Sequence, residues 1–281
     1  MDGCHTLRSP GLAPCVLALS VCSALRMASC HVMSESVLPA SEDKTRFVRS
    51  MFDTIAGRYD LVNRLMTFGL DQGWRRRAIT ELGLAVDSVV LDLGCGTGDL
   101  TREAARQGLR PIGVDLSFAM LAASRRRVGP LVEADAETLP IGDGSLDGLV
   151  SGFALRNFTD LPKVFNEIAR VLKTGGRLVI LEVDRPRSPL LRLGDDLWFR
   201  HVVPKIGALF SDAAAYRYLP ESVAYLPNPS ELHALLSAAG FSQIRRTPLQ
   251  GGLAQIVAAT KATVGYVLGD AQIADTTEGA A

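Results

Sequence analysis

A glycine-rich stretch after an apolar run is the first place where the residue types suggest chemistry. Residues 89–100 read VVLDLGCGTGDL. A β-branched run that ends in a carboxylate, followed by closely spaced glycines and a helix-like segment, is typical of a buried parallel strand that turns into a helix. Glycines in such a turn let a ligand touch the backbone, so we expect ligand contacts at Asp92, Gly94 and Gly96.

The class of ligand is inferred from what this loop lacks. A dinucleotide-binding loop has the pattern G-x-G-x-x-G, whose third glycine lets a pyrophosphate approach the helix N-terminus. Asp99 occupies that position here. Two carboxylates, Asp92 and Asp99, would repel a pyrophosphate and favour a cationic ligand. S-adenosylmethionine fits, because it carries a sulfonium, an ammonium and a ribose but no phosphate, whereas a nicotinamide-dependent oxidoreductase is disfavoured.

A second acidic residue strengthens this interpretation. The short apolar run from Pro111 to Val114 ends in Asp115, 17 residues after Gly98. An acidic side chain at the end of the second strand of such a unit accepts hydrogen bonds from ribose hydroxyls. A strand, a glycine loop, a helix, a second strand and an aspartate follow one another here in the expected order. This order predicts a ribose contact at Asp115.

Composition argues against several other classes of protein. Lys plus Arg equals Asp plus Glu at 30 each, so no overall field attracts nucleic acid or anionic lipid. The aromatic content of 6% offers no base-stacking platform, and the 47% hydrophobic content suffices for a core. Four of the five cysteines lie in the first 30 residues, which argues against a disulfide framework. No histidine spacing resembles a metal site, so we expect no metal.

Strands that alternate with helical segments predict an α/β fold. Besides the run ending at Asp92, we expect strands at residues 111–114, 131–135, 146–153 and 177–183, and two closing strands at 241–249 and 253–260. Helix caps are expected at Ser117, Asp160 and Ser230. The first five strands would form a doubly wound parallel sheet, which binds ligands at the carboxyl ends of its strands.

Several segments differ from the part of the chain that forms the sheet. Residues 1–32 are an apolar leader, interpreted as outside the fold: a result of start-site choice or, alternatively, a targeting peptide. Residues 45–80 predict an amphipathic helical arm, which can both pack on the core and cover the ligand cleft. Residues 184–229 predict an apolar insertion that covers the substrate, with plain packing as the alternative. We expect one domain over residues 33–261 and a disordered tail over 262–281.

Several motifs resemble a known family, the C-methyltransferases of menaquinone and ubiquinone biosynthesis. They are FDTIAGRYDLVNRLMTFGLDQGWR, LDLGCGTGDL, FALRNFTD, RVLKTGGRLVILE and YRYLPESVAYLPNPSELHALLSAAGF. The likeness runs from about residue 47 to residue 261. It implies a Rossmann-like class I methyltransferase sheet with an antiparallel seventh strand, and S-adenosyl-L-methionine as the cofactor. It also implies cofactor contacts at Thr97, Asp115, Asp135 and Ala136.

The chain departs from the family pattern at three positions. A serine that is common after the fourth strand is Gly152 here, so the cofactor contact at this position would lack a hydroxyl. The usual glycine of FGLRN is Ala154, and KPGG is KTGG at Thr174. The last two changes are structurally conservative.

The resemblance implies methylation of a ring carbon of a reduced, polyprenylated demethylmenaquinol, the last step of menaquinone biosynthesis. The matching benzoquinol step of ubiquinone synthesis is the nearest alternative, and a non-enzymatic quinone-binding partner is another. We expect a cytoplasmic protein whose partner is the quinol and not nucleic acid. A peripheral membrane contact and a homodimer are both compatible with the sequence.

Ring methylation also predicts which residues take part in catalysis. The acceptor must be the quinol, whose hydroxyl loses its proton as the ring carbon attacks the sulfonium methyl. Candidates at the edge of the cleft are Tyr59 and Asp60 from the arm, and Arg156 and Asn157 after the fourth strand. Arginine stays protonated, so Arg156 would hold a water and stabilise the developing phenolate, while Asn157 would orient that water or the second oxygen. The alternative for Arg156 is a salt bridge at the strand end.

Overall fold

The computed structural model describes residues 41–124, 128–186, 188–198, 218 and 221–263. The expectations for residues 1–32 lie outside this part of the chain, as do those for the tail beyond residue 263 and for residues 199–217 of the insertion. The proposed domain limits stay predictions.

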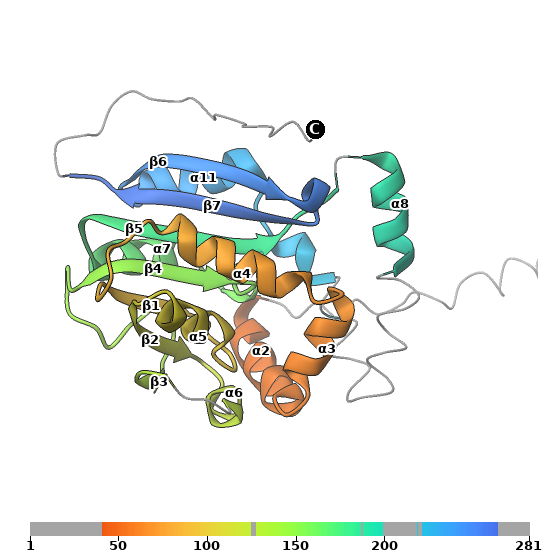
Figure 1. Cartoon of the computed structure of the whole chain (residues 1–281), viewed down its shortest axis with the longest axis horizontal. Coiled ribbons are helices and arrows are strands. Elements are labelled where there is room, and N and C mark those ends of the chain that lie inside the picture. The colour runs from red at the N-terminus through yellow and green to blue at the C-terminus, as the bar shows by residue number, and fades with distance from the viewer. Residues whose placement is uncertain (1–40, 125–127, 187, 199–217, 219–220, 264–281) are drawn as a thin grey trace, which may run out of the picture. The chain divides into compact units, whose positions relative to one another are not determined.

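A seven-stranded mixed sheet carries the fold (Figure 1). Its strands are β1 (Val89–Leu93), β2 (Arg110–Asp115), β3 (Leu131–Glu133), β4 (Leu146–Gly152), β5 (Leu172–Val183), β6 (Phe241–Leu249) and β7 (Ala254–Lys261). They lie in the order β3-β2-β1-β4-β5-β7-β6. Neighbours from β3 to β5 pair in parallel, whereas β7 runs antiparallel to both β5 and β6. The predicted sheet with an antiparallel last strand is confirmed.

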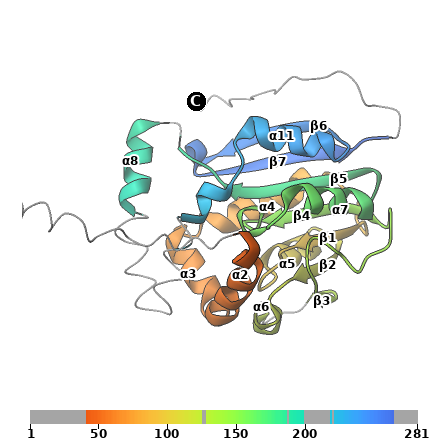
Figure 2. The same ribbon diagram turned by 180° about the vertical axis from the view of Figure 1, so that it is seen from behind.

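Helices cover both faces of this sheet. They are α2 (Ser41–Ile55), α3 (Tyr59–Met66), α4 (Leu70–Glu81), α5 (Asp99–Arg106), α6 (Phe118–Ala123), α7 (Leu161–Val171), α8 (Pro189–Leu197) and α11 (Pro229–Ala238), with short 3-10 turns η1 (Leu155–Asn157), η3 (Ser222–Tyr225) and η4 (Gln250–Gly252). Figures 1 and 2 show α4 and α5 on one face and α7 and α11 on the other.

The two faces are buried because side chains alternate along each strand. In β1, Val90 belongs to the apolar cluster under α4 and α5. The next residue, Leu91, belongs to the cluster under α7 and α11. A parallel sheet covered on both sides reads as a continuous apolar run, which is the pattern seen in the sequence.

Local signals predicted most element boundaries. The Ser117 hydroxyl accepts a hydrogen bond from the amide of Met120, and the Asp160 side chain accepts one from Lys163, so both expected caps are confirmed. The predicted cap of α11, Ser230, is wrong. Asn228 takes that role instead of Ser230, since Pro229 has no amide hydrogen and suits the first position of the helix.

Two strands differ in length from the prediction. The third strand ends at Glu133, so Asp135 lies beyond it in the following loop. The fifth strand begins at Leu172 and not at Arg177. Leu172 pairs with Leu146, and a register shift separates this pair from the pairs that begin at Gly148 and Arg177.

The predicted helical arm consists of α2, α3 and α4. Figure 1 shows α2 and α3 beside the carboxyl ends of β1, β2 and β4. Their apolar side chains form a third cluster, which includes Val48, Ile55 and Val62 and also Tyr218 from the insertion. In the described part of the chain, no helix combines the length and apolarity that crossing a bilayer requires.

Candidate functional site

A pocket lies at the carboxyl ends of β1, β2 and β4, where the arm covers the sheet edge. Of the twelve residues predicted for the site, eight line it: Tyr59, Gly94, Gly96, Asp115, Asp135, Ala136, Gly152 and Asn157. Asp92, Thr97 and Arg156 are buried and do not line it, and Asp60 is half-buried and does not line it either. The structure therefore gathers the predicted cofactor and acceptor residues around one pocket.

The glycine loop takes a backbone conformation that other residues rarely adopt. Gly94, Gly96 and Gly98 have φ angles of 69°, 55° and 83°. The amides of Gly94 and Cys95 both donate to the carbonyl of Val114 at the end of β2, at 2.8 and 3.0 Å. A Cβ atom at Gly94 would lie 2.6 Å from the Cβ atom of Ala154, so the loop and η1 are in close contact.

Asp115 is fixed by the backbone on both sides. Its carboxylate accepts hydrogen bonds from the amide of Gly96 at 2.7 Å and from the amide of Ser117 at 2.9 Å. Burial raises the pKa of Asp115, and these amide donors oppose the rise. Each carboxylate oxygen has a second lone pair, so Asp115 can also accept hydrogen bonds from ligand hydroxyls in the pocket.

Asp92 has a different environment at the end of β1. It is fully buried, and one of its oxygens accepts a hydrogen bond from the Thr101 hydroxyl at 2.6 Å. The other oxygen, Oδ1, has no hydrogen-bond partner among the described residues. Burial raises the pKa of Asp92 to about 6. A buried acceptor without a donor suits a cationic ligand group nearby.

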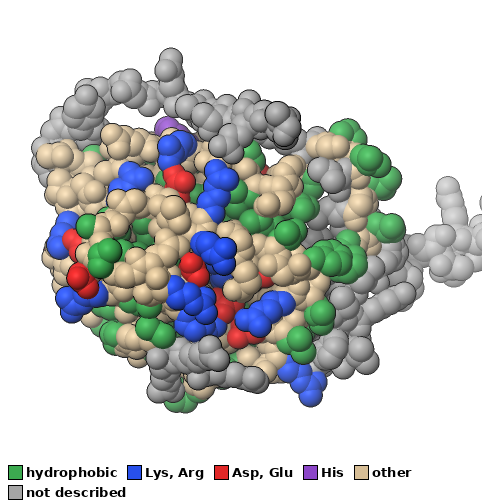
Figure 3. Space-filling view, viewed as in Figure 1, with side chains coloured by type: hydrophobic (Ala, Val, Ile, Leu, Met, Phe, Trp, Pro, Cys, Tyr) green, Lys and Arg blue, Asp and Glu red, His purple; other side chains and the backbone are tan. Residues whose placement is uncertain are grey.

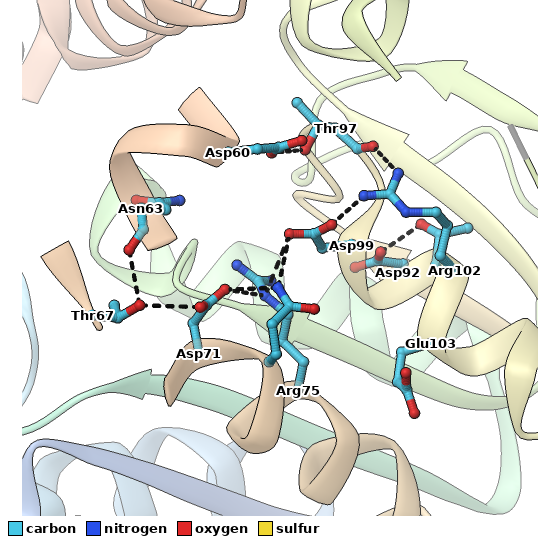
Figure 4. Close-up of polar contacts among 12 residues, drawn as sticks. Asp60, Asn63, Thr67, Asp71, Arg75, Asp92, Thr97, Asp99, Arg102 and Glu103 are labelled. Atoms are coloured by element: carbon cyan, nitrogen blue, oxygen red, sulfur yellow. Dashed lines mark hydrogen bonds and ion pairs between the residues drawn. The ribbon is translucent and has the colours of Figure 1, made fainter. Parts of the chain in front are cut away.

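Figure 4 shows how a polar network joins the arm to the loop and to α5. The Thr97 hydroxyl donates to Asp60 of α3, and the Thr97 carbonyl accepts from Arg102 at 2.7 Å. Thr97, which the resemblance implies as a cofactor contact, thus directs its hydroxyl to the arm in this structure. Asp60 therefore connects the arm to the glycine loop.

The charge of Asp99 is compensated within the protein, which was not predicted from the sequence. Its carboxylate pairs with Arg102 and lies 3.8 Å from Arg75, which also contacts Asp71 at 3.4 Å (Figure 4). Neighbouring arginines therefore compensate its charge. An uncompensated negative charge on Asp99 is therefore not available to repel a pyrophosphate from the glycine loop.

Arg156 and Asn157 follow β4 but face different surroundings. Arg156 is buried, pairs with Glu182 at the end of β5, and donates through Nε to the Ser222 hydroxyl at 3.1 Å. Asn157 lines the pocket, and its Oδ1 accepts a hydrogen bond from the Tyr218 hydroxyl at 3.2 Å. The salt bridge considered for Arg156 exists, and Asn157 is the member of the pair that lines the pocket.

Tyr59 lines the pocket from the start of α3. Its ring packs edge-on against Phe52, with centroids 5.9 Å apart. Burial raises the pKa of Tyr59, while a hydrogen bond with Asn63 and the charges of Arg75 and Arg156 lower it. The positive charge of Arg156 therefore reaches this pocket residue although Arg156 does not line the pocket.

Several residues of α2 line the pocket although the sequence did not predict them there. Thr45, Val48 and Phe52 line the pocket. The helix is attached at both ends, because the Lys44 amine donates to the Phe158 carbonyl at 2.7 Å and Asp53 accepts from the Ser117 hydroxyl. The apolar period of this segment indicated a packed helix, but nothing local indicated which strand ends it would contact.

The fold and the site together define a protein class. A seven-stranded sheet in this order, with a glycine loop after β1 and an acidic residue ending β2 at one pocket, is the Rossmann-like fold of class I methyltransferases. The chain belongs to the ubiE/COQ5 methyltransferase family, whose model matches residues 39–261.

Curated relatives agree with this membership. The demethylmenaquinone methyltransferase of Thermus thermophilus is 44% identical over 73% of this chain and 97% of its own length. The ubiquinone/menaquinone biosynthesis C-methyltransferase UbiE of Syntrophotalea carbinolica is 40% identical over 77% of this chain and 95% of its own length.

A solved structure supports the fold alone. A methyltransferase from Thermotoga maritima, described as a possible histamine N-methyltransferase, aligns with a TM-score of 0.52 at 22% identity. The alignment covers 77% of this chain and 97% of that one.

Among the described residues, no group of histidine, cysteine and acidic side chains is arranged to hold a metal ion.

Proposed function

We propose that this methyltransferase uses S-adenosylmethionine to methylate a ring carbon of a reduced demethylmenaquinol, the last step of menaquinone biosynthesis. The observation that carries the proposal is a single pocket with a glycine loop and Asp115 on one side, and Tyr59 and Asn157 on the other. The name of the 44% identical relative supports a naphthoquinol over a benzoquinol.

The residues on the loop side fit the cofactor. Asp115 has lone pairs for ribose hydroxyls, and Gly94 and Gly96 leave the backbone accessible. The unpartnered Oδ1 of Asp92 suits the ammonium group. Asp135, Ala136 and Gly152 complete the wall of the pocket. When bound, S-adenosylmethionine supplies an electrophilic methyl group, and its sulfonium sulfur takes the electrons of the broken C–S bond.

The acceptor side acts on the ring oxygen. The ring carbon provides the electron pair of the new C–C bond while the neighbouring hydroxyl gives its proton to water, and the hydrogen on that carbon then moves to the oxygen to restore the quinol. We assign the contacts with the ring oxygens to Asn157 and Tyr59, because both residues line the pocket. Arg156, held by Glu182, stabilises the negative charge on the ring oxygen through its own positive charge.

An exposed apolar face supports an acceptor with a greasy tail. Leu190, Leu193 and Leu197 recur at helical spacing along α8 and are 78%, 66% and 60% exposed. Figure 3 shows hydrophobic side chains gathered over this helix. We propose that the protein is cytoplasmic. Because a polyprenyl chain dissolves in a bilayer, we also propose that the protein contacts the membrane peripherally.

Methylation by the purified full chain tests the proposal. Reduced short-chain demethylmenaquinone and a demethylated benzoquinol of equal chain length are each offered with S-adenosylmethionine, and products are followed by mass spectrometry. We expect the naphthoquinol to be methylated faster. Faster benzoquinol methylation would overturn the ring assignment, and methylation of neither would overturn the proposed activity.

The role of Arg156 is tested by substitution. Arg156→Ala should lower single-turnover methylation by about 100-fold or more, the scale of a lost oxyanion-stabilising group, with cofactor affinity near wild type. Arg156→Lys retains a positive charge and serves as a second variant if the first does not fold. Arg46→Ala is the matched control, because the Arg46 side chain is 87% exposed. Unchanged turnover, or a parallel loss of cofactor affinity, would contradict the role.

A further inference from the structure

The side-chain amide of Asn157 is held by a residue from a distant part of the chain. Tyr218 lies in the insertion, 61 residues further on, and its hydroxyl donates to Asn157 Oδ1 at 3.2 Å. The Tyr218 side chain is fully buried, and its ring packs against Phe47 of α2 with centroids 5.4 Å apart. Tyr218 therefore has a fixed position between the arm and η1.

This hydrogen bond decides which group of Asn157 remains for a ligand. An amide has an oxygen acceptor at one end and an NH2 donor at the other. The oxygen is engaged by Tyr218, and no hydrogen bond to another described residue uses Nδ2. Because Asn157 lines the pocket, its NH2 group is the end left to meet a ligand.

We propose that Tyr218 is a positioning residue, which turns the Asn157 amide so that its NH2 group donates to the acceptor ring oxygen. This inference rests on the proposed function and extends it, since it makes the pocket specific for a ring oxygen that accepts a hydrogen bond. The oxygen beside the attacked carbon gains negative charge as its proton leaves. An NH2 donor stabilises that charge, whereas an amide oxygen in the same place would repel it.

The state of the tyrosine suits this role. Burial raises the pKa of Tyr218 to about 12, so its hydroxyl keeps its proton at neutral pH and remains a donor. Tyr218→Phe removes the donor but keeps the ring that packs against Phe47. The Asn157 amide could then flip, and part of the population would present its oxygen to the pocket.

A double-mutant cycle distinguishes positioning from plain packing. We expect Tyr218→Phe to lower kcat for demethylmenaquinol by about 3- to 10-fold, the scale of one lost hydrogen bond, with the KM for S-adenosylmethionine unchanged. Asn157→Ala should lower kcat further. In the Asn157→Ala background, Tyr218→Phe should have no additional effect, because the amide that it orients is gone.

The matched control is Tyr225→Phe, which removes a hydroxyl from a tyrosine that does not line the pocket and should leave kcat unchanged. Equal losses from Tyr218→Phe with and without Asn157 would overturn the inference and leave the proposed function intact. An unchanged kcat in Tyr218→Phe would also overturn it. A wild-type chain that does not methylate demethylmenaquinol would instead overturn the proposed function, and the inference with it.

Discussion

The two halves of the pocket are held in place by different means. On the half that we propose for the cofactor, called the cofactor half, Asp115 is fixed by the amides of Gly96 and Ser117, which belong to the adjoining loop and to its own turn. On the half that we propose for the quinol, called the acceptor half, Arg156 and Asn157 depend on side chains 26 to 66 residues away in sequence. Substitutions in the first half should therefore weaken ligand binding, and substitutions in the second should weaken the fold or the geometry.

Glu182 offers the strongest way to break this comparison. Glu182→Ala leaves the guanidinium of Arg156 buried without its partner, and we expect the free energy of unfolding to fall by about 3 to 5 kcal/mol. Chemical denaturation of the purified chain measures this. Glu182→Gln keeps an acceptor for Arg156 but loses the charge, so its loss should be smaller. A loss below about 1 kcal/mol for the alanine variant would show that the pair does not support the acceptor half.

Asp92 sharpens the comparison, since it lies in the cofactor half but is buried with an unpartnered oxygen. Its pKa is about 6 in the fold and 3.8 without the fold, so the folded state binds the proton more tightly between these values. The stability of the wild type should therefore fall as pH rises through this window. Relative to the wild type, the free energy of unfolding of Asp92→Asn should rise by about 3 kcal/mol from pH 3 to pH 7.

Asp147→Asn is the matched control for this pH series. A hydrogen bond from Lys173 lowers the pKa of Asp147, so the wild-type carboxylate adds stability as pH rises. The difference between Asp147→Asn and the wild type should then change with pH in the opposite direction. Parallel stability curves for Asp92→Asn and the wild type would contradict the raised pKa.

The smallest expected effect concerns ligand binding in the cofactor half. Asp115→Ala should weaken S-adenosylmethionine binding by about 1 to 3 kcal/mol, the scale of lost charged hydrogen bonds. Isothermal titration calorimetry measures the dissociation constant. Asp143→Ala is the control, because that side chain is 81% exposed. An affinity equal to that of the wild type would remove Asp115 from the cofactor site.

The sequence predicted the strands and the loop around Asp115 because their signals are local. An apolar strand, a glycine loop and the carboxylate that ends β2 lie within residues 89–115, and each leaves a recognisable pattern. The sheet and the caps at Ser117 and Asp160 followed from the same kind of short-range rule. The ion pair between Asp99 and Arg75 was not predicted, because Arg75 on α4 lies 24 residues earlier in the chain.

The acceptor half could be predicted only in part. Its residues Arg156 and Asn157 were named because they follow the fourth strand, but their partners Glu182, Ser222 and Tyr218 left no local signal. Because Tyr218 lies in an apolar insertion, its sequence context predicts only a core residue. Its hydrogen bond to Asn157 follows from the fold, which brings the insertion back to the edge of the sheet. Contacts across long sequence separations depend on topology and not on residue pattern.

The close contact between Gly94 and Ala154 sets how near the two halves can approach each other. A side chain at Gly94 would overlap the Ala154 methyl, with Cβ atoms only 2.6 Å apart. Between them these two positions hold one methyl group and have no room for a second. A larger residue at either position would require the glycine loop to move away from η1. Such a change would also move the proposed methyl donor away from its proposed acceptor.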